Sequence, residues 1–119
     1  MRLTTSLLLA LLTSITYASE PIWLDVRTPQ EFSEEHVQNA INIPFDQITT
    51  DITGISADKG SEIVLYCRSG RRADIAMSTL QQLGYTNVVN LKTLEAAKAA
   101  RALRTSESKK NTVENENEN

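Results

Sequence analysis

The sequence predicts an α/β protein in which three layers, α/β/α, are built around a central, mainly parallel sheet of about four to five strands. Short apolar stretches typical of buried strands alternate with segments of helical periodicity. The expected strands cover residues 22–26, 40–44, 62–66 and 87–91, and the main expected helices cover residues 29–36, 72–83 and 94–103. The most apolar of these strands is followed by a cysteine, at the edge of the sheet where α/β folds bind ligands.

Local sequence signals mark where these elements begin and end. Thr28 is an expected helix N-cap, Pro29 suits a first helical turn, and Glu31 completes a capping box. In the segment 72–83, small and apolar side chains recur at helical spacing before Gly84, a natural C-cap. These side chains are Ala73, Ala76, Met77, Leu80 and Leu83.

The two ends of the chain differ from the expected domain. Residues 1–18 begin with a positive charge, continue with an apolar run and end in small residues, which predicts a signal peptide cleaved after Ala18. The apolar run is shorter than the ~18 residues that span a bilayer, so we expect an exported, periplasmic protein without a stable membrane anchor. Residues 19–104 are expected to form one domain, and the polar residues 105–119 a disordered tail.

Composition excludes several classes of function. The 119 residues carry 12 basic and 15 acidic side chains, a net charge of −3, which is unfavourable for nucleic-acid binding. The single cysteine, Cys67, cannot form an internal disulfide, and one cysteine with one histidine is too few ligands for a metal site. We therefore expect no metal and no cofactor, and a free thiol with a chemical role.

The loop after the most apolar strand concentrates positive charge beside this thiol. Its sequence is Cys67-Arg68-Ser69-Gly70-Arg71-Arg72, between an expected strand and an expected helix. A helix N-terminus offers unpaired N–H groups, and Gly70 lets the backbone curl so that they face inward. These features favour a thiolate and an anionic substrate, whereas a buried structural cysteine is the alternative. We predict Cys67 as the catalytic nucleophile, and as substrate-binding residues Arg68, Ser69, Gly70, Arg71 and Arg72.

Four segments of the chain resemble the rhodanese-like sulfurtransferase family in order and spacing: residues 24–32, 35–44, 67–72 and 83–88. The resemblance extends over about residues 22–91 and is greatest to small periplasmic rhodaneses of the phage-shock-protein-E type. It implies that residues 19–104 form a single rhodanese-like domain. It also implies that Cys67 takes a sulfane sulfur from a donor such as thiosulfate, forms a persulfide, and passes the sulfur to cyanide or to a thiol.

Two positions depart from the family pattern. Asn39 replaces a usual glycine, and asparagine tolerates the left-handed backbone conformation better than most residues. The segment Leu91-Lys92-Thr93-Leu94 replaces a usual glycine pair near the active loop. We expect the bulkier side chains to narrow the pocket and Lys92 to add a cation.

Other polar residues have structural interpretations by the same resemblance. Asp25 and Arg27 flank the end of the first expected strand and are expected to brace the site as an ion pair. His36 falls in a structural turn, although a cysteine–histidine nucleophile pair is the alternative.

Two other classes of function use a similar loop. A persulfide carrier that serves a partner protein, without turnover, needs the same residues as the enzyme. Cysteine phosphatases and arsenate reductases place five residues between cysteine and arginine, whereas four lie between Cys67 and Arg72, and residue 73 is alanine. A thiol–disulfide oxidoreductase is disfavoured because the chain has no second cysteine. We expect a monomer that takes a small anionic sulfur donor and a thiol or cyanide acceptor.

Overall fold

The computed structural model describes residues 19–117, so the expected signal peptide over residues 1–18 lies outside the described part of the chain. Strands and helices alternate along it. The strands are β1 (Ile22–Asp25), β2 (Ile41–Asn42), β3 (Ile63–Cys67) and β4 (Val88–Thr93). The helices are α1 (Pro29–Glu34), α2 (Ile48–Ile55), α3 (Arg71–Gln82) and α4 (Leu94–Asn117).

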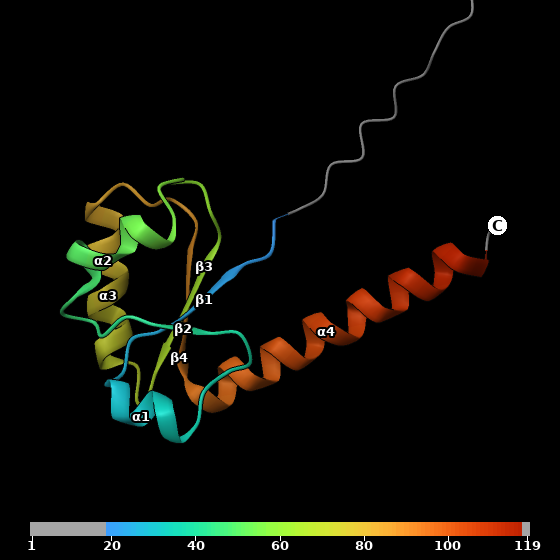
Figure 1. Ribbon diagram of the computed structural model, residues 1–119, viewed down its shortest axis with the longest axis horizontal. Coiled ribbons are helices and arrows are strands. Elements are labelled where there is room, and N and C mark those ends of the chain that lie inside the picture. The colour runs from blue at the N-terminus through green and yellow to red at the C-terminus, as the bar shows by residue number, and fades with distance from the viewer. Residues whose placement is uncertain (1–18, 118–119) are drawn as a thin grey trace, which may run out of the picture.

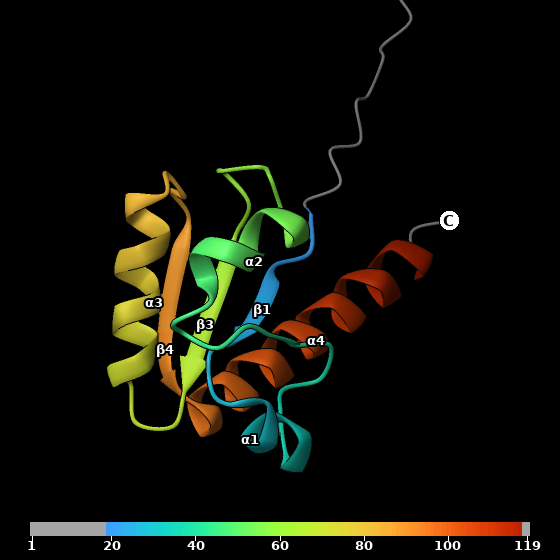
Figure 2. The same cartoon turned by 60° about the vertical axis from the view of Figure 1, so that its left-hand side comes forward.

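The strands form one parallel sheet in the order β2-β1-β3-β4. Helices α2 and α3 cover one face of this sheet and α4 lies on the other, as Figures 1 and 2 show from two sides. A parallel sheet needs cover on both faces because its strands are apolar on both sides. All five residues of the central strand β3 are buried. The predicted three-layer fold is therefore confirmed.

Two clusters of buried side chains fill the spaces between the layers. Beneath α2 and α3 the cluster consists of Leu24, Val26, Ile43, Ile48, Ile52, Ile63, Leu65, Cys67, Ala73, Ala76, Leu80 and Tyr85. Beneath α4 the cluster is smaller and consists of Trp23, Val37, Val64, Tyr66, Leu94 and Ala97. Alternate residues of β3 enter opposite clusters, which places the Cys67 side of the strand under the start of α3.

Among residues 19–117, two residues other than glycine have a positive φ. Asn39 has φ 64°, which confirms the expected left-handed turn before β2. Lys92 has φ 70° and lies in β4 where the register between β3 and β4 shifts. Leu65 pairs with Asn90 and Cys67 with Thr93, so β4 contains one residue more than β3 over this interval. This is the geometry of a β-bulge, here directly beside the position where Cys67 pairs with Thr93.

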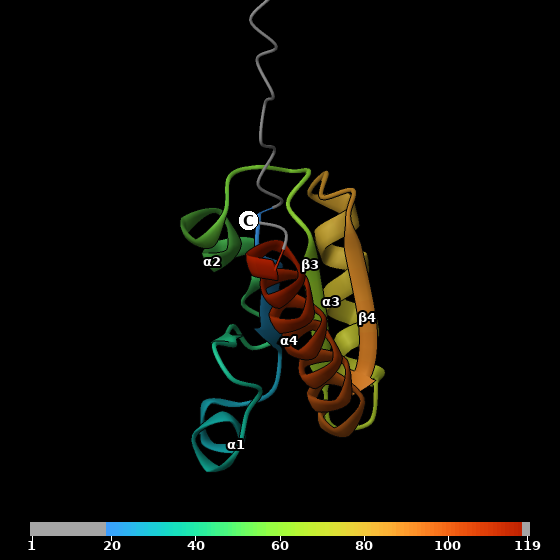
Figure 3. The ribbon, with the colours of Figure 1, turned by 90° about the vertical axis from the view of Figure 1, so that its right-hand side faces the viewer.

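The expected disorder of residues 105–119 differs from the structure, in which α4 continues to Asn117. Every residue from Ala102 to Asn117 is exposed, and α4 buries only Leu94 and Ala97. The alanine-rich first turns pack on the sheet and nucleate the helix, after which each further residue adds a hydrogen bond at small cost. Figure 3 shows α4 crossing the face of the sheet opposite α2 and α3.

Within residues 19–117, no helix combines the length and the apolar character of a membrane-spanning segment.

Candidate active site

Cys67 is the last residue of β3 and its side chain is buried. Two backbone groups lie against its sulfur. The N–H of Gly70 donates to Cys67 Sγ at 2.9 Å, and Sγ donates to the carbonyl oxygen of Lys92 at 3.3 Å. The sulfur is thus held between a donor from its own loop and an acceptor from the bulge in β4.

The loop turns sharply at Gly70, which is the N-cap of α3 and has φ 100°. Only glycine adopts this conformation without a steric penalty, so the residue permits the N–H at the start of the helix to point back at the sulfur. The N-terminal end of a helix favours a negative charge. The geometry at Gly70 therefore suits a thiolate or a persulfide anion on Cys67.

Arg72 forms a bidentate ion pair with Glu31 of α1. Its Nη1 lies 2.6 Å from Oε1 and its Nη2 lies 3.1 Å from Oε2. The hydrogen bonds that Arg72 donates to Glu31 are the main cause that lowers the pKa of Glu31 to about 2, and the same hydrogen bonds raise the pKa of Arg72. The charge of Cys67 also raises the pKa of Arg72, which places this guanidinium within the electrostatic reach of the thiol.

The sequence did not reveal this partner of Arg72. Glu31 was expected only to complete the capping box with Thr28, and that capping box is present as well. Asp74, the acid that directly follows the loop in the sequence, lies instead near Lys92 and Asn90. The pairing joins residues 41 positions apart, so no local pattern could have indicated it.

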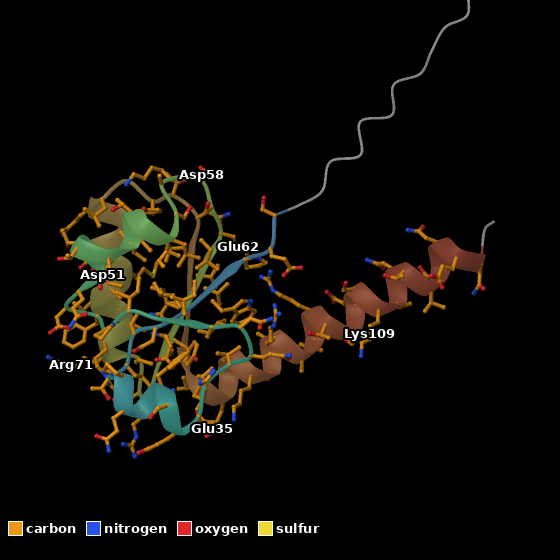
Figure 4. The ribbon with its side chains drawn as sticks, in the orientation of Figure 1. Glu35, Asp51, Asp58, Glu62, Arg71 and Lys109 are labelled. Carbon is orange, nitrogen blue, oxygen red and sulfur yellow. The ribbon has the colours of Figure 1, made fainter. Side chains whose placement is uncertain are left out.

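The other polar residues of the loop point outward. Arg68, Ser69 and Arg71 are exposed, and Figure 4 shows Arg71 at the outer edge of the molecule. Arg68 lines a groove of about 530 Å³ that begins at the loop. The remaining lining residues of this groove are Arg27, Glu31, Glu34, Glu35, Leu94 and Glu95. Four of the seven lining residues are glutamates, so Arg68 is an exposed cation at the loop end of an otherwise mainly acidic groove.

Asp25 and Arg27 form a buried ion pair at the end of β1. Arg27 Nε donates to both carboxylate oxygens at 3.0 and 3.1 Å, and Nη2 donates to Oδ2 at 2.7 Å. The same Nη2 also donates to the carbonyl of Glu35 at 2.6 Å, which ties the strand to the segment after α1. The hydrogen bonds that Arg27 donates to the Asp25 carboxylate raise the pKa of Arg27. This geometry supports a bracing role for the pair.

His36 lies away from the hydrogen bonds that the sulfur makes. Its Nδ1 donates to the carbonyl of Phe32 at 2.7 Å, and its ring stacks on the Phe32 ring with centroids 3.9 Å apart. Both contacts belong to the end of α1, in keeping with a structural turn. Among residues 19–117 there is no group of three or more histidine, cysteine, aspartate or glutamate side chains placed to hold a metal ion.

The sequence of this chain also matches the sequence model of a known protein family. Residues 5–93 match the family model of the rhodanese-like domain, about three quarters of the chain. The chain belongs to the rhodanese-like family.

Individual relatives agree with this assignment. The chain is 39% identical over 84 residues to the thiosulfate sulfurtransferase PspE of Escherichia coli, a match that covers 71% of this chain and 81% of that protein. It is 36% identical over 69 residues to a sulfurtransferase of Allochromatium vinosum, covering 58% of this chain and 63% of that protein.

Solved structures give the same result. A structure described as rhodanese with anions from E. coli superposes with a TM-score of 0.62 at 38% identity, covering 65% of this chain and 91% of that chain. The Rhodanese_3-like domain of the Anabaena protein Alr3790 superposes with a TM-score of 0.60 at 27% identity, covering 68% of this chain and 93% of that chain.

Proposed function

We propose that the chain is a sulfurtransferase that moves a sulfane sulfur from a donor such as thiosulfate to cyanide or a thiol, through a persulfide on Cys67. Membership of the rhodanese-like family and the likeness to two sulfurtransferases support the reaction class. The observation that carries the mechanism is the position of Cys67 Sγ, which receives the N–H of Gly70 at the start of α3.

The reaction has two balanced steps. In the first, the Cys67 thiolate attacks the outer sulfur of thiosulfate, the bond within the donor breaks, and its electron pair leaves on sulfite. In the second, cyanide attacks the outer sulfur of the persulfide, the S–S bond breaks, and its electron pair returns to Cys67. Thiocyanate leaves and the thiolate is regenerated. The first step moves negative charge from Cys67 Sγ to the outer sulfur of the persulfide. The second step returns it to Sγ, where the Gly70 N–H and the helix N-terminus stabilise the thiolate.

The loop residues have separate roles in this scheme. The exposed guanidinium of Arg68 attracts the anionic donor toward the loop. Arg72 lies close enough to act on the charge at Cys67, but Glu31 neutralises part of its own charge. We also propose that Ser69 and Arg71 contribute to substrate binding, and that Asp25 and Arg27 support the structure of the site.

Steady-state turnover tests the activity and separates the enzyme from a carrier. The purified protein should form thiocyanate from thiosulfate and cyanide over many cycles, and Cys67→Ser should form none. A carrier without turnover would release at most one equivalent of sulfur. No thiocyanate above the level of the variant would contradict the proposed activity.

We also propose that the protein is exported and cleaved after Ala18. The support is the leader pattern of residues 1–18, a charged start followed by an apolar run and small residues. Mass spectrometry of the protein from its native host should find Ser19 at the N-terminus. A protein that retains Met1 would overturn this proposal without affecting the activity.

A further inference from the structure

Lys92 lies against the cysteine loop with both its backbone and its side chain. Its carbonyl oxygen is 3.3 Å from Cys67 Sγ. Its stem covers Gly70: a Cβ placed on that glycine would lie 3.2 Å from Lys92 Cβ, 3.4 Å from Cγ and 3.6 Å from Cδ. One residue of β4 therefore borders both the sulfur and the residue whose N–H contacts the sulfur.

Several contacts hold Lys92 in this position. Its N–H donates to Asn90 Oδ1 at 2.8 Å, and Asn90 Nδ2 donates to Asp74 Oδ1 at 2.7 Å. Its ammonium group lies 3.5 Å from the same Asp74 oxygen, although both side chains are largely exposed and this contact is weak. The bulge and the left-handed backbone at Lys92 turn the stem toward Gly70.

A groove borders the loop on a different side from Lys92. The groove of about 530 Å³ meets the loop at Arg68, and its other lining residues come from α1, from the segments at the ends of α1 and from the start of α4. Lys92 borders the same loop at Gly70 instead. A molecule that approaches the sulfur from the side of Gly70 contacts the Lys92 stem. The stem therefore hinders the approach of a bulky molecule more than that of a compact one.

We propose that Lys92 is a specificity-determining residue of the sulfur-transfer site, whose backbone and stem close the Gly70 side of the loop and favour compact acceptors over bulky ones. The proposal rests on the proposed function. In the step concerned, an acceptor thiolate attacks the outer sulfur of the Cys67 persulfide, and the S–S bond to Sγ breaks. The electron pair returns to Cys67 and the acceptor leaves as a persulfide.

The test compares two neutral thiols of similar acidity, 2-mercaptoethanol and phenylmethanethiol, which differ in bulk. The protein is loaded with thiosulfate and freed of excess donor, and the loss of the extra sulfur atom is followed by mass spectrometry with each thiol. The measured quantity is the rate with the bulky thiol divided by the rate with the compact thiol. A merely structural defect would slow sulfur transfer to both thiols by the same factor and leave this ratio unchanged.

Three variants separate the effect of the Lys92 stem from the effect of its charge and from a general effect of substitution. Lys92→Gly removes the stem and suits the left-handed backbone, and should raise the ratio about tenfold, the lower end of what steric pockets discriminate. Lys92→Met keeps most of the stem without its charge and should leave the ratio unchanged. Asn39→Gly is the matched control, because it removes another side chain at a positive φ, far along the sequence from the loop. It should also leave the ratio unchanged.

The outcomes are distinguishable. An unchanged ratio in Lys92→Gly, or an equal rise in Lys92→Met, would overturn the role of the Lys92 stem while leaving the sulfurtransferase intact. A wild-type protein that never acquires sulfur from thiosulfate would overturn the proposed function and this inference with it. If Lys92→Gly fails to fold, Lys92→Ala serves in its place, since it removes every stem atom beyond Cβ.

Discussion

Replacing Arg27 by alanine would leave the Asp25 carboxylate buried without its cation. In the native protein the Asp25 side chain is 0% exposed and that of Arg27 is 7% exposed. Three side-chain hydrogen bonds join them, and the Arg27 backbone N–H donates to Oδ1 at 2.9 Å as well. After the substitution, the hydrogen bond from the backbone N–H of residue 27 is the only one of these contacts with the carboxylate that remains.

The size of the effect follows from the burial. Removing one partner of a buried ion pair typically costs about 3–5 kcal/mol, because the charge that remains is uncompensated. The hydrogen bond from Arg27 Nη2 to the Glu35 carbonyl is lost as well, which destabilises the fold further. For a domain of about 100 residues, 3 kcal/mol corresponds to a fall in Tm of more than about 12 °C.

Urea and thermal unfolding of matched variants measure this cost. Arg104→Ala is the control, because Arg104 pairs with Glu62 at 2.7 Å but is 43% exposed, and it should cost less than about 1 kcal/mol. Adding Asp25→Asn to Arg27→Ala should restore part of the stability, since it removes the uncompensated charge. The reasoning is refuted if Arg27→Ala costs no more than Arg104→Ala, or if Asp25→Asn makes the Arg27 variant less stable.

Three further predictions concern the loop and the tail. Arg72→Ala should slow the formation of the persulfide about tenfold in single-turnover measurements. This is less than the loss in rate of about 10²–10³ that follows removal of a well-placed hydrogen-bond donor, because Glu31 already binds the guanidinium. An unchanged rate would contradict this prediction. Glu31 has its pKa lowered from 4.5 to about 2, so its ion pair stabilises the fold above pH 4.5 and this contribution is lost as the pH falls toward 2. The stability difference between wild type and Glu31→Gln should therefore shrink over that window in urea titrations, and a constant difference would exclude the pair as its source. Truncation after Arg104 should leave Tm and thiocyanate formation nearly unchanged, because the described residues beyond it are all exposed; a large loss of either would show that the tail supports the domain.

The sequence was most informative where a signal is local. The unbroken apolar run of β3 and the repeating small and apolar residues of α3 located the two elements that carry the loop. The capping box at Thr28 was recognisable from four consecutive residues. Asn39 was recognisable as a left-handed position because few residue types tolerate that conformation. Such patterns depend on neighbours in the chain, and the sequence alone contains them.

Contacts between distant segments were not predictable in this way. The ion pair of Arg72 with Glu31 depends on how α1 packs beside the loop, and the bulge at Lys92 depends on the register between two strands. The sequence indicated that Lys92 narrows the pocket, but not that its carbonyl lies against Cys67 Sγ. The helical tail was missed because a polar composition predicts disorder, while a helix already nucleated on the sheet continues without packing.

The central claim is that Cys67 is a nucleophile that carries sulfur. Intact mass spectrometry after incubation with thiosulfate tests it most directly. The account predicts that the protein gains the mass of one sulfur atom, that cyanide removes it, and that Cys67→Ser never gains it. A wild-type protein that gains no sulfur from thiosulfate or from any other sulfane donor would contradict the claim and leave Cys67 as a buried structural thiol.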